Sequence, residues 1–129
     1  MATPNPTEGE LAILRVLWSR KAPMTVREVH AELSRGKDTA YTTVLKMLTI
    51  MAEKGLVRRD ESERSHTYRA SHAEPVVQSS LLKDLMRRAF SGSALTLVQR
   101  ALDDETASAE DLDAMAKLIA QAKAKRKKG

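Results

Sequence analysis

Residues 39–70 read TAYTTVLKMLTIMAEKGLVRRDESERSHTYRA, and their apolar pattern changes at Gly55. After Gly55, the extended stretches 56–60 and 65–70 flank the polar segment 61–64, which predicts a short hairpin. Before Gly55, apolar residues recur at the spacing of one buried helix face, and these residues are Val44, Leu48 and Met51. This part of the chain is therefore predicted to form a helix followed by a two-stranded ribbon.

Two more helices are predicted upstream, each opened by a capping box in which a threonine precedes a glutamate by one turn. The boxes are Thr7 with Glu10 and Thr25 with Glu28. The first helix carries the apolar run 11–18 to about Arg20, and the second is expected to end near Gly36, a typical C-terminal cap residue. The third helix is expected to begin at Asp38 or Thr39.

Three helices and a ribbon in this order predict a winged helix-turn-helix, whose third helix has the dimensions to enter the major groove of DNA. The expected fold class is mostly α with a small β-hairpin, in which the winged helix-turn-helix precedes a three-helix dimerisation region. The predicted domains are a winged helix DNA-binding domain over residues 1–72, a helical dimerisation domain over 73–122 and a basic tail over 123–129.

The three C-terminal helices are predicted from caps and apolar spacing. Pro75 opens the first, the second spans Ala94 to Leu102, and Ser108 with Asp111 caps the last. Their apolar positions cover a wider arc than one packing surface needs, which favours a homodimer. The alternative is that these helices fold back on the N-terminal part as one monomeric core. The expected dimerisation residues are Leu81, Leu82, Leu85, Met86, Phe90, Leu95, Val98, Leu112, Met115, Leu118 and Ile119.

Charge is divided unevenly along the 129 residues. Residues 1–72 carry 12 Lys and Arg against 9 Asp and Glu, residues 73–122 carry 5 against 8, and residues 123–129 carry 5 against none. This partition indicates that only part of the chain faces a polyanion, whereas the tail fits a solvated helix end. The absence of cysteine and of a long apolar run predicts a cytoplasmic protein without membrane contact.

The predicted contacts with double-stranded DNA lie mainly on the third helix. Thr42 and Thr43 fall in its first turn, where hydroxyl and methyl groups can reach base edges, and Lys46 follows one turn later. Tyr41 and Thr25 are included in the predicted DNA-binding set. The alternative is that the threonine and lysine face is hydrophilic cover without a partner.

The ribbon adds four arginines. Arg64 lies near the predicted tip, where a wing would follow the DNA backbone or the narrow groove. The other three are expected instead to pair across the strands with the neighbouring acidic residues. These three are Arg58, Arg59 and Arg69.

No motif supports catalysis or a cofactor. The sequence contains no HExxH, no GxxxxGK[ST], no GxGxxG and no GxSxG. The three histidines, His30, His66 and His72, are isolated from one another in sequence and are not expected to bind a metal. We therefore predict no catalytic residue, no metal site and no enzyme activity.

Several segments resemble the penicillinase repressor (BlaI/MecI) family. The similarity covers about residues 7–120 and implies a bacterial homodimeric repressor that reads a palindromic operator and dimerises through its C-terminal helices. It also implies release through cleavage in the C-terminal region by a membrane sensor protease, as in the antibiotic-responsive members of the family. The segments that carry the resemblance are Ala40 to Leu45, Ala52 to Arg59, Glu10 to Trp18, Thr25 to Val29 and Phe90 to Ser93.

Two departures limit what this resemblance implies. Ile50 occupies a position that is often basic in such proteins, which puts one backbone contact in doubt. Copper-responsive relatives carry a C-terminal cysteine cluster, and a chain without cysteine cannot sense copper in that way. Two other hypotheses stay open: a winged helix regulator that responds to a small ligand, and a protein-interaction module without an operator.

Overall fold

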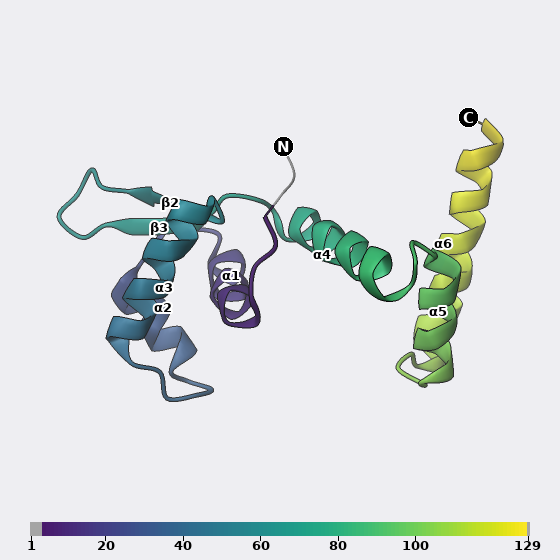
Figure 1. Cartoon of the computed structure of the whole chain (residues 1–129), viewed down its shortest axis with the longest axis horizontal. Coiled ribbons are helices and arrows are strands. Elements are labelled where there is room, and N and C mark those ends of the chain that lie inside the picture. Colours follow the sequence, from purple (N-terminus) through teal and green to yellow (C-terminus); the bar gives the residue numbers. More distant parts are fainter. Residues whose placement is uncertain (1–3, 129) are drawn as a thin grey trace. The chain divides into compact units, whose positions relative to one another are not determined.

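The computed structural model describes residues 4–128, which form two compact units. The first unit holds the described residues up to Lys83, and the second holds those from Asp84 onward. The elements of the first unit are α1 (Glu8–Arg20), β1 (Met24–Thr25), α2 (Val26–Leu33), α3 (Tyr41–Lys54), β2 (Val57–Asp60), β3 (Thr67–Ala70) and the start of α4 (Glu74–Ala89). The second unit holds the rest of α4, α5 (Ala94–Asp103) and α6 (Ala109–Lys128) (Figure 1).

Both predicted capping boxes are present. The N–H of Glu10 donates to Thr7 Oγ1 at 3.2 Å, and the N–H of Thr7 donates to Glu10 Oε1 at 2.9 Å. Thr25 and Glu28 repeat this exchange at the start of α2, at 3.2 and 2.9 Å. Each box satisfies two backbone N–H donors that a free helix end would leave without a partner.

The core of the first unit contains the residues of α3 that the apolar spacing predicted to be buried. Val44, Leu48 and Met51 on α3 are buried and pack with apolar residues of α1, α2 and the sheet. Trp18 lies partly buried against this core, and its Nε1 donates to the carbonyl oxygen of His72 at 2.9 Å. Burial of one face of α3 leaves its other face in solvent.

The sheet has three antiparallel strands in the order β1-β3-β2, so the predicted hairpin forms one side of a larger sheet. In the hairpin, Val57 pairs with Ala70, and Arg58 pairs with Arg69. The unpredicted strand β1 is two residues long, and its Met24 pairs with Tyr68. Figure 1 shows the ribbon extending beyond the helices of this unit as a wing.

Two predicted helix boundaries are wrong, namely the end of the second helix and the start of the third. The second helix ends at Leu33, before Gly36, because the chain after the cap residue Ser34 tightens into a turn, in which the N–H of Arg35 bonds the carbonyl oxygen of Glu32, three residues back, at 3.3 Å. The third helix begins at Tyr41, later than predicted, because Ala40 is extended, with φ −70° and ψ 141°.

The three predicted C-terminal helices are present. Ser93 caps α5, and Ser108 with Asp111 forms the expected box before α6, where the N–H of Asp111 donates to Ser108 Oγ at 3.1 Å. The last helix runs through the basic tail to Lys128. Neither α5 nor α6 contains a buried residue among its described positions. None of the described helices is both long and apolar enough to span a membrane.

Candidate nucleic-acid interface

The exposed face of α3 carries the three central residues of the predicted DNA contact. Thr42, Thr43 and Lys46 are exposed, whereas Val44 and Leu48 on the opposite face are fully buried. Because the buried residues fix the rotation of the helix about its axis, the exposed residues keep a defined direction. This arrangement matches the outward threonine and lysine face expected from the sequence.

The other predicted DNA-binding residues line one hollow. A cavity of about 430 Å³ lies between the start of α2, α3 and the wing, and Thr25, Tyr41 and Arg64 contribute to its walls. Thr42, Thr43 and Lys46 do not line it, and Thr43 borders a second hollow of about 710 Å³ beside α1. The six predicted residues therefore form two adjacent groups on the first unit.

Thr25 has a structural role that limits its freedom to contact a ligand. Its Oγ1 accepts from the N–H of Glu28 and lies 3.2 Å from Glu28 Oε1, to which its hydroxyl donates. The hydrogen bond from the Thr25 N–H, with help from Arg20, lowers the pKa of Glu28 despite some opposing burial. The Thr25 hydroxyl thus holds the start of α2.

His30 is a residue of this interface that the sequence analysis missed. Its Nε2 donates to the carbonyl oxygen of Thr39 at 2.7 Å, and its ring meets the ring of Tyr41 edge-on at 5.7 Å between centroids. The α2–α3 turn and the first residue of α3 are therefore both held by one side chain. A single histidine in a helix pattern gives no signal of such a contact with a turn nine residues later.

Arg27 is a second missed residue. It is exposed in the first turn of α2 and lines the same hollow as Tyr41 and Arg64. Among the residues that the structure describes, neither Arg27 nor Arg64 takes part in an ion pair. The signal available in the sequence was an arginine two residues after a helix cap, beside the positive end of the helix.

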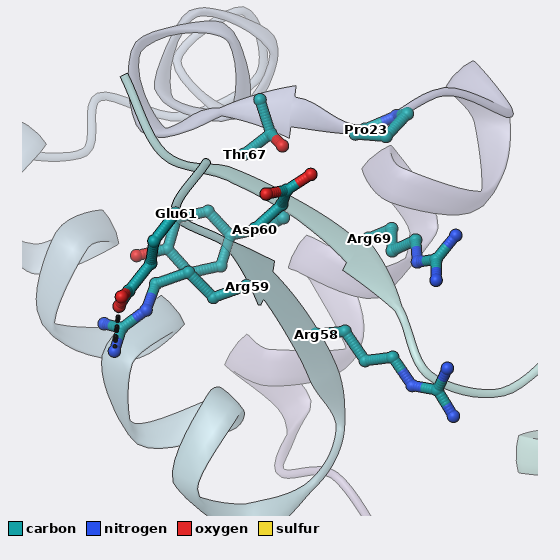
Figure 2. A pocket seen from close by; sticks show the side chains of 8 residues that line it. Pro23, Arg58, Arg59, Asp60, Glu61, Thr67 and Arg69 are labelled. Carbon is teal, nitrogen blue, oxygen red and sulfur yellow. Dashed lines mark ion pairs between the residues drawn. The ribbon is translucent and has the colours of Figure 1, made fainter. Parts of the chain in front are cut away.

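The prediction that three wing arginines pair with acids across the strands is wrong. Arg59 pairs with Glu61 at 2.7 Å, although Glu61 follows β2 rather than lying across the sheet (Figure 2). Arg58 and Arg69 instead lie opposite each other in the register and, within residues 4–128, form no ion pair. The hydrogen bond from the Ser62 N–H to the Asp60 carboxylate, at 2.9 Å, is the main reason that the pKa of Asp60 is lowered.

The far end of α3 is fixed by an ion pair between the exposed Lys54 and the buried Glu10. Lys54 Nζ donates to both carboxylate oxygens of Glu10, at 2.7 and 3.0 Å. This pair joins the first turn of α1 to the last turn of α3.

The described residues hold no group of three acidic or histidine side chains that could bind a metal ion.

A three-helix core that turns a threonine and lysine face outward beside a β-ribbon defines the winged helix class of DNA-binding domains. The family model described as Penicillinase repressor matches residues 6–121 of the chain. The protein belongs to this family, as the sequence resemblance indicated, and it is a transcriptional regulator of the BlaI type with a DNA-binding winged helix.

Individual relatives agree with this assignment. The transcriptional regulator BlaI of two Mycobacterium tuberculosis strains is 35% identical over 116 residues, which cover 89% of this chain and 83% of that regulator. The solution structure of the DNA-binding domain of the repressor BlaI has a TM-score of 0.50 and 25% identity, covering 59% of this chain and 93% of that domain. The same values hold for the monomeric form of Bacillus licheniformis BlaI in complex with the blaP half-operator.

Proposed function

We propose that the protein is a homodimeric transcriptional repressor that reads a palindromic operator through α3 and the wing. The observation that carries this proposal is the exposed face of Thr42, Thr43 and Lys46 on a helix whose other face is locked in the core. A related BlaI was solved with a half-operator, which supports the same partner here. The protein acts by binding DNA in the cytoplasm, not as an enzyme.

The residues divide into base readers and backbone contacts. Thr42 and Thr43 offer a hydroxyl and a methyl group to base edges at the start of α3, while Lys46 reaches a phosphate. Tyr41 and Arg64 contact the backbone from the walls of the hollow between α3 and the wing. Thr25 acts mainly by placing α2, because its hydroxyl is engaged with Glu28.

Dimerisation is supported by the apolar side chains that the single chain leaves in solvent. All eleven predicted dimerisation residues lie on α4, α5, α6 or the residue after α4, and none of them is buried. Leu95 is 78% exposed and Leu118 is 63% exposed. A second copy of the chain would remove this surface from water, at about 25 cal/mol for each Å² of apolar area.

Release by proteolysis is the proposed means of induction. The family resemblance suggests a sensor protease that cuts in the C-terminal region, and α5 lies in that region. A cut there would separate the winged helix from part of the proposed dimer surface. Two half-sites would then be bound by independent chains, which lowers affinity through lost effective concentration.

A salt series of gel shifts tests the DNA contact. Lys46→Gln should weaken binding to a duplex selected by the wild-type protein and reduce the slope of log affinity against log salt by about 2, one for each subunit of the proposed dimer. Arg15→Gln is the matched control, because Arg15 is an exposed cation on α1, outside the predicted interface. Thr43→Val should change base preference with little change in slope. Equal behaviour of Lys46→Gln and Arg15→Gln would contradict the assignment of α3.

A further inference from the structure

Arg58 and Arg69 emerge together on the outer face of the wing sheet. They are direct cross-strand partners in β2 and β3, and such partners project on the same face. Their neighbours Val57 and Tyr68 are buried, so these neighbours mark the inner face, which packs on the core. Figure 2 shows the two arginine side chains extending in the same direction, away from the Arg59–Glu61 pair.

This placement is electrostatically unfavourable in the free protein. Like charges directly opposite each other in an antiparallel pair destabilise a sheet, and neither guanidinium has an ion pair within 4.0 Å among the described residues. Two acidic residues lie close by but have other partners. Glu61 pairs with Arg59, and Asp60 accepts from the N–H of Ser62 while it feels the charge of Arg69 at longer range.

The same face has room for a ligand. A hollow of about 520 Å³ lies over the sheet, and its lining includes Arg58, Arg69 and the partly buried Thr67. Pro23, the residue before β1, borders it on the other side of β3. Asp60, Glu61 and Arg59 also line it. The two carboxylates oppose an anion and Arg59 is paired with Glu61, so a ligand must interact mainly with the guanidinium groups of Arg58 and Arg69.

We propose that Arg58 and Arg69 form a phosphate-binding site on the outer face of the wing sheet, which takes a phosphate of the DNA backbone. Two adjacent planar guanidinium groups can each donate two hydrogen bonds to phosphate oxygens, and the phosphate charge removes their mutual repulsion. The DNA part of this inference rests on the proposed function. The inner face of the sheet packs on the helices, so the arginine pair lies on the opposite face. The phosphate that it binds therefore belongs to DNA that flanks the segment contacted by α3.

Thermal unfolding in inorganic phosphate tests the site without DNA. At equal ionic strength, phosphate should raise the Tm of the wild-type protein more than chloride does, and Arg58→Gln or Arg69→Gln should remove the difference. Arg15→Gln is the matched control because it removes the same charge from an exposed residue of α1 that does not line this hollow. In chloride, Arg58→Gln and Arg69→Gln should keep or raise the Tm, since each removes a repulsion.

Duplex DNA identifies the carrier of the phosphate. The probes are a duplex selected by the wild-type protein, in a form trimmed to the operator and in a form with longer flanks. The wild-type protein and Arg15→Gln should bind the flanked form more tightly. Arg58→Gln and Arg69→Gln should lose this gain and reduce the salt slope by about 2, one for each subunit of the proposed dimer.

The outcomes separate the two proposals. If phosphate stabilises Arg58→Gln and Arg69→Gln as much as Arg15→Gln, the site is refuted. If the phosphate effect depends on both arginines but flank length never matters, the ligand is a free phosphate compound and the DNA assignment is overturned. If the wild-type protein retains no duplex at all, the proposed function fails, while the phosphate arm still decides whether the arginine pair binds an anion.

Discussion

Glu10 is the buried charged residue of the described chain, with 5% of its surface exposed. Burial alone would raise the pKa of its carboxyl group, but the hydrogen bonds from Lys54 and from the Thr7 N–H outweigh burial and lower the pKa below 4.5. The carboxylate therefore serves two functions in the fold. It completes the cap of α1 and anchors the end of the DNA-facing helix.

We expect Glu10→Gln to lower the free energy of unfolding by about 2 kcal/mol, because the amide cannot replace charged bonds to Lys54. The stabilisation by a carboxylate with a lowered pKa is complete above the ordinary value of 4.5 and is lost as pH falls through the folded pKa. Urea unfolding from pH 7 to 3 should thus show a steeper loss for the wild-type protein than for the variant. The exposed Glu8 offers a control, and a Glu8→Gln loss as large as that of Glu10→Gln would contradict this role.

His30 provides a second test at the level of single residues. His30→Gln keeps an N–H donor at similar reach for the Thr39 carbonyl, whereas His30→Phe keeps a ring beside Tyr41 but has no donor. If the hydrogen bond places the start of α3, His30→Phe should weaken operator binding by about 5-fold, the equivalent of roughly 1 kcal/mol. His30→Gln should bind more tightly than His30→Phe. The reverse order, at equal Tm, would show that the ring contact matters instead.

Among the elements, the helix starts that a capping box marks were predicted correctly. Thr7, Thr25 and Ser108 mark starts because the capping box is local, with both partners within one turn of sequence. The end of α2 depends on how the turn to α3 is held. A contact between His30 and Thr39 cannot be inferred from residue spacing, so Gly36 was wrongly chosen as the cap.

The sheet was predicted only in part, for a related reason. Strand β1 has two residues and thus no alternation to detect, and it exists because β3 offers a free edge to pair with. The register of the hairpin places Arg58 opposite Arg69, a pairing that local charge complementarity argues against. The outward face of α3 was predictable because the buried spacing of Val44 and Leu48 determines the opposite side.

Helix α2 gives a prediction about element stability. Thr25→Ala should lower the free energy of unfolding by about 1 kcal/mol, because it removes the cap acceptor for the Glu28 N–H. Thr25→Ser keeps the hydroxyl and should lose less than half of that amount. Urea titrations at neutral pH would measure both. Equal losses for serine and alanine would mean that the methyl group, rather than the cap, carries the effect.

At the level of the whole molecule, the second unit exposes apolar side chains that a second copy of the chain would cover. Leu85 is 48% exposed and lies in the predicted dimerisation set, whereas Val76 is 46% exposed on the same helix and lies outside that set. Leu85→Asp should raise the dimer dissociation constant more than ~10-fold, because burying a leucine contributes about 2 kcal/mol. Val76→Asp should leave the dimer dissociation constant nearly unchanged. Sedimentation over a concentration series measures both, and a wild-type monomer at every concentration would contradict the homodimer.

The central claim is that two copies of α3 read DNA together, each with its threonine and lysine face. Selection of bound fragments from random duplex DNA tests it most directly, since it reports specificity, symmetry and spacing in one measurement. The account predicts an inverted repeat whose half-site centres lie about 10 base pairs apart, or a multiple of that distance. Recovery of unrelated sequences, or of a motif without two-fold symmetry, would contradict it.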